Sequence, residues 1–255
     1  MNNLYESQNI PAAERNRLKS LGSDYLLYIS TEALGENVKD KIVLDLGAGP
    51  STALGKWVNK KGGHYIALDI QGTFLEEHAK KGHDVVQGNI EHLPYKPKTI
   101  DIAHTRLVLM HLSSEMRKQA VQEIIKVTKE KCLFLEPDWN SFLGSVVVNR
   151  LRDFALRFLT KRSDPYMGVK LKKEIELILS GTDLKIAETR FLREAGTDYD
   201  ELIKIIASLK SLVEQTDPAL IPEAEEIARA INEEAGKERP EAFKLPDFVL
   251  VSVTP

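Results

Sequence analysis

Short apolar runs and stretches with helical spacing alternate along the first half of the 255-residue chain. The apolar runs have the length of buried strands, and helical patterns separate most of them. Strands that alternate with helices indicate a doubly wound, mainly parallel α/β sheet with helices on both faces. Ser113 can cap a helix that follows the fourth strand. The other helices are predicted at residues 12–34, 52–60 and 72–81, and the strands at 41–46, 64–70, 84–90, 99–105 and 131–137.

The alternation ends after Trp139, and the pattern of the second half is mainly helical. Asp198 and Glu201 resemble a capping pair for a helix at 201–213. Further helices are predicted at 143–160, at 169–180 and from Pro222 to near Gly236, with strands at 184–191 and 248–253.

We interpret the chain as one domain, residues 1–255, in which helical segments enclose a ligand-binding core. Helical segments of this kind exclude water from a site and shape its specificity. The helix at 201–213 either belongs to this enclosure or forms the surface of a homodimer. The parts are an N-terminal helical lid (1–35), the core (36–139), a helical cap with the sixth strand near 184–191 (140–245) and the final strand (246–255).

Composition and charge narrow the classes of partner. The chain has 42% hydrophobic residues, 29% charged residues and a net charge of −3, so no basic field favours nucleic acid or an anionic membrane. Its one cysteine, Cys132, cannot form an internal disulfide. Neither a signal-peptide pattern nor an apolar run of membrane-spanning length is evident. We therefore expect a cytoplasmic protein with no nucleic-acid or membrane partner.

The stretch "IVLDLGAGPSTALGKWV", residues 42–58, predicts a buried strand, a glycine turn and the start of a helix. In an open parallel sheet, ligands bind beyond the carboxyl ends of the strands, where this turn lies. Gly47 and Gly49 allow the backbone to approach a ligand closely. Asp69 ends the second strand about 20 residues later, where a carboxylate can accept hydrogen bonds from ribose hydroxyls. The pattern therefore predicts an adenosine-type ligand.

Two features of the turn argue against a dinucleotide. The third glycine of the dinucleotide fingerprint, which lets a helix pack closely under a pyrophosphate, is replaced by Thr52. Asp45 precedes the glycines, where a carboxylate would repel a pyrophosphate but attract an ammonium group. Asp45 either orders the glycine turn alone or also contacts such an ammonium group.

Five segments within residues 36–139 resemble, in order, the motifs of class I S-adenosylmethionine-dependent methyltransferases. They are "VLDLGAGPS", "IALDI", "QGNIEHLPY", "IDIAHTRLVLMHL" and "FLEPDW". The resemblance is greatest to the branch that methylates small molecules, which includes quinone-biosynthesis and natural-product enzymes. It implies a Rossmann-like fold of seven strands, with "FVLVSV" as an antiparallel strand at the sheet edge, and S-adenosyl-L-methionine as the cofactor. The cofactor-binding residues that it implies are Asp45, Gly47, Ala48, Gly49, Asp69, Ile70, Asn89, Ile90, Thr105 and Arg106.

The resemblance also assigns roles within this set. Asp69 would bind the ribose of the cofactor, and Asn89 and Ile90 would lie against the adenine. The chain around Thr105 and Arg106 would approach the methionine end. The Arg106 side chain either binds the cofactor carboxylate or pairs with an acidic residue of the protein.

Transfer of a methyl group from a sulfonium requires alignment of the acceptor, and no catalytic triad or metal cluster is needed. His111 either acts as a general base near the acceptor or packs at the start of a helix. Three residues after the fifth strand either face the acceptor or hold the loop there: Glu136, Asp138 and Trp139. His78 and His83 are five residues apart, which is not the spacing of a zinc-binding helix, and no metal site is predicted.

The leading hypothesis is methyl transfer to an O, N or C atom of a small organic molecule by in-line displacement. An RNA or protein methyltransferase is an alternative, but "HTRL" stands where base-methylating enzymes carry an Asn/Asp-Pro-Pro-Tyr/Phe motif. A dinucleotide-dependent oxidoreductase is a second alternative, and its Tyr-x-x-x-Lys pair is not evident. A catalytically inactive protein that only binds the cofactor is the third.

Overall fold

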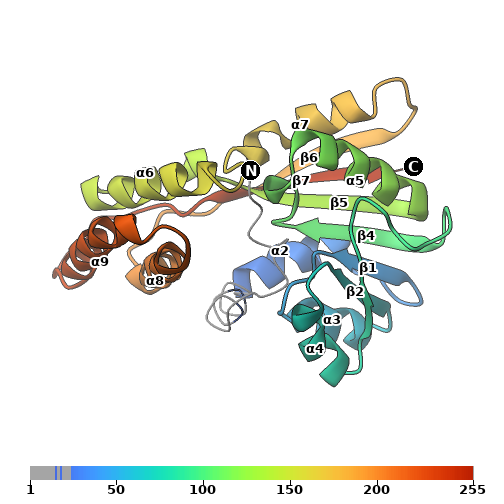
Figure 1. The fold of residues 1–255 in the computed structure, drawn as a ribbon, viewed down its shortest axis with the longest axis horizontal. Coiled ribbons are helices and arrows are strands. Elements are labelled where there is room, and N and C mark those ends of the chain that lie inside the picture. The colour runs from blue at the N-terminus through green and yellow to red at the C-terminus, as the bar shows by residue number, and fades with distance from the viewer. Residues whose placement is uncertain (1–14, 16–17, 19–23, 255) are drawn as a thin grey trace.

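The computed structural model describes residues 15, 18 and 24–254, and a seven-stranded sheet in the order β3-β2-β1-β4-β5-β7-β6 forms its centre (Figure 1). The strands β1 to β5 pair in parallel, whereas β7 is antiparallel to β5 and to β6. The mainly parallel, seven-stranded sheet expected from the sequence is thus confirmed. The strands are β1 (Ile42–Leu46), β2 (His64–Asp69), β3 (Asp84–Gln87), β4 (Ile100–Arg106), β5 (Thr128–Asp138), β6 (Lys185–Phe191) and β7 (Asp247–Thr254).

The lengths of two strands differ from the prediction. β3 ends at Gln87 because the chain then turns, and the amide of Gly88 donates to the carbonyl of Asp69 at 3.0 Å. β5 begins at Thr128, earlier than predicted, because the chain passes from a helix into the strand without a separate turn. A register shift in the pairing of β4 with β5 accommodates this early start.

The sheet edge also differs from the prediction. The final strand β7 is antiparallel, as expected, but it lies between β5 and β6, so β6 is the edge strand. The exposure of the two strands explains this order. Most residues of β6 are exposed, including charged ones, whereas all but two residues of β7 are buried. A polar strand tolerates the edge of a sheet, and an apolar strand is stabilised by neighbours on both sides.

Helices cover both faces of the sheet. The helices α2, α3 and α4 lie on one face, and α5 and α7 lie on the other (Figure 1). The part of the predicted first helix before Asp24 lies outside the described residues, apart from residues 15 and 18, which are helical. The bounds on these faces are α2 (Asp24–Leu34), α3 (Ala53–Lys60), α4 (Gly72–Lys80), α5 (Ser114–Val127) and α7 (Met167–Ile178), with a short 3-10 helix, η2 (Leu109–His111), before α5.

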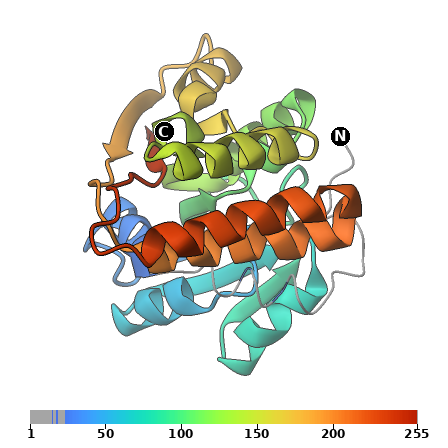
Figure 2. The ribbon, with the colours of Figure 1, turned by 90° about the vertical axis from the view of Figure 1, so that its left-hand side faces the viewer.

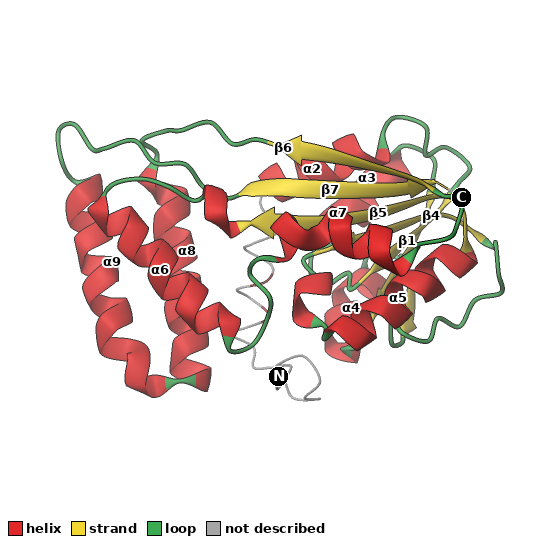
Figure 3. Ribbon diagram, turned by 90° about the horizontal axis from the view of Figure 1, so that it is seen from above, coloured by secondary structure: helices red, strands yellow, loops and turns green. Residues whose placement is uncertain are grey.

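Three further helices form a cap beyond the carboxyl end of β5. They share an apolar core of their own, built around Phe142, Phe154 and Leu202, that is separate from the two clusters against the sheet. Seen from the cap side, the helices lie across the end of the sheet (Figure 2), and β5 points toward them (Figure 3). They are α6 (Val146–Thr160), α8 (Tyr199–Thr216) and α9 (Ile221–Ala235), with the short helices η3 (Trp139–Ser141) and η4 (Pro218–Leu220).

The predicted capping residues Ser113 and Asp198 are confirmed, but the predicted partner of Asp198 is wrong. Ser113 caps α5 by accepting from the amide of Met116. Asp198 caps α8 by accepting from the amide of Asp200, but Glu201 is not the second half of a capping pair, because its carboxylate binds the guanidinium of Arg193.

In the described part of the chain, no helix combines the length and the apolar character that a membrane span requires.

Candidate active site

The glycine turn between β1 and α3 is fixed by contacts with β2 and with the turn after β4. The amides of Gly47 and Ala48 donate to the carbonyl of Leu68 at 2.8 and 3.1 Å. Gly47 has a φ of +68°, and a Cβ atom placed on it would lie 2.4 Å from Cγ2 of Val108. Gly49 has a φ of +60°, but a Cβ atom there would meet nothing within 4 Å. Gly47 therefore leaves room for the side chain of Val108, whereas Gly49 borders open space.

Asp69 connects the glycine turn to the end of β2. Its Oδ2 atom accepts from the amide of Gly49 at 2.9 Å, and its Oδ1 atom accepts from the amide of Gln71 at 2.8 Å. Burial raises the pKa of Asp69 to about 6, although these amides favour the ionised form. The side chain is therefore mostly a carboxylate at neutral pH, with its orientation fixed. The next residue, Ile70, is 43% exposed and offers an apolar surface beside it.

Asp45 lies beneath the turn in a buried polar cluster. Its Oδ1 atom is 2.8 Å from Nδ1 of His104, and its Oδ2 atom accepts from the hydroxyl of Tyr65 at 2.7 Å. Burial alone would raise the pKa of Asp45, but the hydrogen bond and charge of His104 bring it below the usual value. Since both oxygens are engaged within the protein, these contacts support the interpretation that Asp45 orders the glycine turn.

Arg106 reaches from β4 to α2. Its guanidinium donates from one nitrogen to the carbonyl of Leu26 at 3.2 Å and to Oγ of Ser30 at 3.3 Å. These contacts are with a carbonyl and a hydroxyl oxygen and not with an acidic side chain, and binding of the cofactor carboxylate by Arg106 stays a prediction. The side chain joins the sheet to the described part of the N-terminal helical segment.

A Tyr65→Phe variant is expected to lose about 1–3 kcal/mol of unfolding free energy, because Oδ2 of the buried Asp45 then lacks its donor. Urea denaturation measures this loss. Tyr28→Phe is the matched control, since the Tyr28 side chain is 53% exposed, and its unfolding free energy should change by less than about 0.5 kcal/mol. Equal effects of the two substitutions would contradict the role assigned to Tyr65.

Two histidines brace the glycine turn: His78 on α4, and His83 just after that helix. Nε2 of His78 lies 3.0 Å from the carbonyl oxygen of Gly49, and Nδ1 of His78 lies 3.3 Å from Nδ1 of His83. A carbonyl only accepts, so His78 carries its proton on Nε2 and accepts at Nδ1 from His83. Burial lowers the pKa of both histidines, in agreement with neutral rings. The peptide of Gly49 is thus held at both its amide and its carbonyl.

The turn after β4 carries His111 and is held by Glu136. Leu107 has a φ of +60°, which is unusual for a residue other than glycine. One oxygen of Glu136 accepts from the amides of Val108 and Leu109 at 3.0 and 2.7 Å. The sequence left open whether Glu136 faces the acceptor or holds the loop after the fifth strand; its contacts instead hold the turn after β4. His111 ends η2 and is partly buried.

Glu136 should make stability fall as pH rises. Burial raises its pKa to about 8 from an ordinary value of 4.5, so between pH 6 and 7 the native carboxyl keeps a proton that the unfolded chain has lost. This group then lowers the unfolding free energy by about 1.4 kcal/mol per pH unit. A Glu136→Gln variant should lack this decline, as measured by urea denaturation at pH 6 and pH 7. Parallel pH profiles for the two proteins would contradict the shift.

The remaining candidate residues also have contacts within the protein, and their predicted roles stay predictions. The side chain of Asn89 accepts from the amide of Glu91 at 2.9 Å, and Ile90 is buried in the apolar cluster on the α5 face. The Thr105 hydroxyl donates to the carbonyl of Leu133 at 3.5 Å, a long bond. Asp138 caps η3 and pairs with Arg190. Their chain positions nevertheless lie at or just after the carboxyl ends of β3, β4 and β5, on the side of the sheet where the glycine turn lies.

Several residues of the site were not found from the sequence. Tyr65, His78 and His104 support the turn through contacts between strands and helices, and Arg117 binds carbonyls of the η2 segment. His78 was considered only as a metal ligand, which its spacing disfavours. A polar residue inside an apolar strand, such as His104 in β4, was the one signal that could have indicated the buried cluster.

Comparison with known proteins identifies the segment that contains this site. Residues 44–135 match the family model described as a methyltransferase domain. The demethylmenaquinone methyltransferase of Thermobifida fusca is 31% identical over 121 residues, which are 45% of this chain and 50% of that protein. A tRNA (carboxymethyluridine(34)-5-O)-methyltransferase of Arabidopsis thaliana is 31% identical over 99 residues, which are 38% of this chain and 24% of that protein. The chain thus spans a half or less of these curated relatives.

Similarity of fold extends over most of the chain. The crystal structure of a putative methyltransferase from an antibiotic biosynthesis pathway of Anabaena variabilis superimposes with a TM-score of 0.61. The match covers 89% of this chain and 96% of that one, at 14% sequence identity. This agreement concerns the fold, and includes the cap as well as the sheet.

Proposed function

Residues 44–135 form a class I, S-adenosylmethionine-dependent methyltransferase domain, and from that premise we propose that the protein methylates an O, N or C atom of a small organic molecule. The observation that carries the proposal is the link from Asp69 to Gly49 at the carboxyl ends of β2 and β1. It places an oriented carboxylate beside a glycine turn that borders open space. This is the arrangement in which ribose hydroxyls can donate to an acid while a nucleoside lies against the backbone.

The residues present fit the cofactor. Asp69 would accept hydrogen bonds from the ribose, and the backbone of Gly47 and Gly49 would line the space beside it. Ile70 offers an exposed apolar side chain next to that carboxylate. The buried polar cluster around Asp45 would hold this turn in shape. When bound, S-adenosylmethionine supplies a methyl group on a positively charged sulfur, which passes to an acceptor lone pair as the sulfur becomes a neutral thioether.

The protein's own contribution is to hold and enclose the acceptor. Correct alignment of reacting groups can supply about 7–11 kcal/mol of a barrier. The turn after β4 is held by Glu136, and His111 at its end would accept a proton from an acceptor that must lose one. The cap helices α6, α8 and α9 would exclude water and select the acceptor, because they lie beyond the carboxyl end of β5.

Small-molecule methylation is favoured over RNA methylation by charge. The net charge of the chain is −3, and binding to an RNA backbone depends on clustered basic side chains. The match to the Thermobifida fusca relative also covers a larger share of both chains than the match to the tRNA methyltransferase. RNA methylation is the second candidate because that tRNA enzyme shares 31% identity over its matched segment.

A transfer assay tests the proposal. The purified protein is incubated with S-adenosylmethionine labelled in its methyl group and, in parallel, with a panel of quinols, phenols and amines or with total tRNA. We expect label in an extractable small molecule and none in tRNA, and we expect the Asp69→Ala variant to give no transfer. Label in tRNA alone would replace the small-molecule acceptor by RNA.

A further inference from the structure

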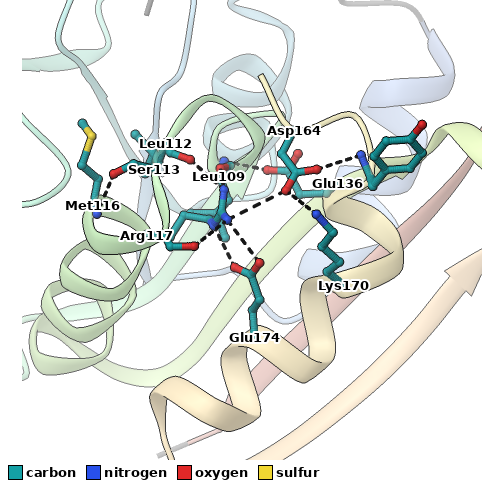
Figure 4. A network of polar contacts seen from close by, with 11 residues as sticks. Leu109, Leu112, Ser113, Met116, Arg117, Glu136, Asp164, Lys170 and Glu174 are labelled. Carbon is teal, nitrogen blue, oxygen red and sulfur yellow. Dashed lines mark hydrogen bonds and ion pairs between the residues drawn. The ribbon is translucent and has the colours of Figure 1, made fainter. Parts of the chain in front are cut away.

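The η2 segment, residues 108–112, is bound at both ends by buried polar side chains. Glu136, from β5, accepts from the amides of Val108 and Leu109 at the start of the segment. Arg117, from α5, donates to the carbonyl of Leu112 at 2.7 Å and to that of Leu109 at 3.5 Å. An acceptor oxygen at the amides and a guanidinium at the carbonyls satisfy backbone groups that a short helical turn leaves unpaired at its ends. Figure 4 shows both side chains directed at the segment.

A second layer of charges holds Arg117 in place. The carboxylate of Glu174, on α7, accepts from Nε of Arg117 at 2.8 Å and from a terminal nitrogen at 3.2 Å. Asp164 lies 3.9 Å from Arg117 and 2.8 Å from Nζ of Lys170 (Figure 4). Its amide donates to the carbonyl of Met110 at 2.6 Å. The η2 segment is therefore attached to β5, to α5 and to the loop just before α7.

The same segment contacts the glycine turn. The side chain of Val108 fills the space beside Gly47, so closely that a Cβ atom on Gly47 would lie 2.4 Å from it. Leu107, immediately before, is in the left-handed region of backbone conformation, which costs about 1–3 kcal/mol unless surrounding contacts enforce it. The contacts that enforce it come directly after it, at the two amides bound by Glu136.

Stability alone does not explain a carboxyl group at this position. Glu136 is fully buried, and its Oε2 atom has no hydrogen-bond partner among the described residues. An apolar side chain of similar size would avoid the cost of burying this group but could not accept from two adjacent amides. Burial of the carboxyl group costs stability, but its hydrogen bonds fix the backbone conformation of residues 107–109. Strained backbone held in this way is typical of a functional site.

We infer that Glu136 is a positioning residue of the active site, which fixes the turn after β4 so that Val108 supports the glycine turn and His111 is held near the acceptor. This inference rests on the proposed function. Arg117 completes the same arrangement from the opposite end of the turn. Neither side chain needs to touch the cofactor or the acceptor to act in this way.

Three variants of Glu136 test the inference. Glu136→Leu removes the acceptor oxygen, Glu136→Asp keeps the carboxyl group but shortens its reach, and Glu136→Gln keeps an acceptor oxygen at full length. Glu130→Leu is the matched control, because Glu130 lies near the start of the same strand, is partly exposed and pairs with Lys41. Hydrogen exchange at the amides of Val108 and Leu109 is measured without ligand. The dissociation constant of S-adenosylhomocysteine, kcat and KM are then measured on the same proteins.

We expect Glu136→Leu and Glu136→Asp to accelerate exchange at the two amides by at least about tenfold. Their kcat should fall by at least about tenfold, with a smaller change in KM for the acceptor. Glu136→Gln should stay within about threefold of the wild type, and Glu130→Leu should match it. If Glu136→Leu does not fold, the exchange rates and the kcat of Glu136→Asp test the inference instead.

Two results separate the possible failures. Faster exchange in a folded Asp or Leu variant with unchanged kcat would overturn the positioning role and leave Glu136 a structural residue. Unchanged exchange would overturn the contacts on which the inference rests. If the wild type neither binds S-adenosylhomocysteine nor transfers a methyl group, the proposed function fails instead, and the positioning role in methyl transfer fails with it.

Discussion

An Asp69→Ala variant is expected to bind S-adenosylhomocysteine at least about a hundredfold more weakly than the wild-type protein. Hydrogen bonds to a charged group each contribute about 1.5–3 kcal/mol, and a factor of ten in affinity corresponds to about 1.4 kcal/mol. The loss would be compounded because the same carboxylate orients the amide of Gly49. Isothermal titration calorimetry measures the change directly.

The matched control for this prediction is Asp84→Ala. Asp84 begins the neighbouring strand β3, at the opposite end from the glycine turn, and its carboxylate pairs with the exposed His64. This substitution should leave the dissociation constant within about twofold, since exposed ion pairs contribute little. An Asp69→Ala variant that unfolds like the wild type and binds with unchanged affinity would show that the ligand lies elsewhere.

A Gly47→Ala variant is expected to lose about 2–5 kcal/mol of unfolding free energy. The left-handed backbone at this residue costs about 1–2 kcal/mol for a side chain, and overpacking against Val108 adds about 1–3 kcal/mol. Thermal and urea denaturation measure the loss. Cofactor binding should weaken as well. The new Cβ atom collides with Val108, so either the glycine turn or the turn after β4 must move to make room for it.

Two further variants separate the causes of this loss. Gly49→Ala shares the left-handed backbone but meets no atom within 4 Å, so its unfolding free energy should fall by the backbone cost alone. Adding Val108→Ala to Gly47→Ala should recover part of the lost stability, because it removes the side chain with which the new Cβ collides. No recovery in the double variant, or equal losses for the two glycines, would contradict the contact between the turns.

The features that the sequence predicted correctly are those determined by local pattern. Buried parallel strands read as continuous apolar runs, so β1, β2 and β4 were found within one or two residues of their ends. The glycine turn and Asp69 were found because both lie at the carboxyl ends of strands, about 20 residues apart along the chain. The cap has no such motif, and only its helices were predicted.

The features that were missed depend on contacts between distant residues. Glu136 and Val108 are 28 residues apart, and Arg106 lies 80 residues from Leu26, so no local spacing connects either pair. The role of Asp45 could not be chosen from the sequence because it depends on Tyr65 and His104 in the neighbouring strands. The order of β7 and β6 likewise follows from tertiary burial rather than from the order of strands along the chain.

The central claim is that the glycine turn and Asp69 form a site for S-adenosylmethionine, and calorimetric titration of the wild-type protein tests it most directly. The protein is titrated with S-adenosylhomocysteine and, separately, with NADP. We predict saturable binding of one S-adenosylhomocysteine per chain and no binding of NADP. Binding of NADP without binding of S-adenosylhomocysteine would contradict the account, because it would assign the same turn to a dinucleotide.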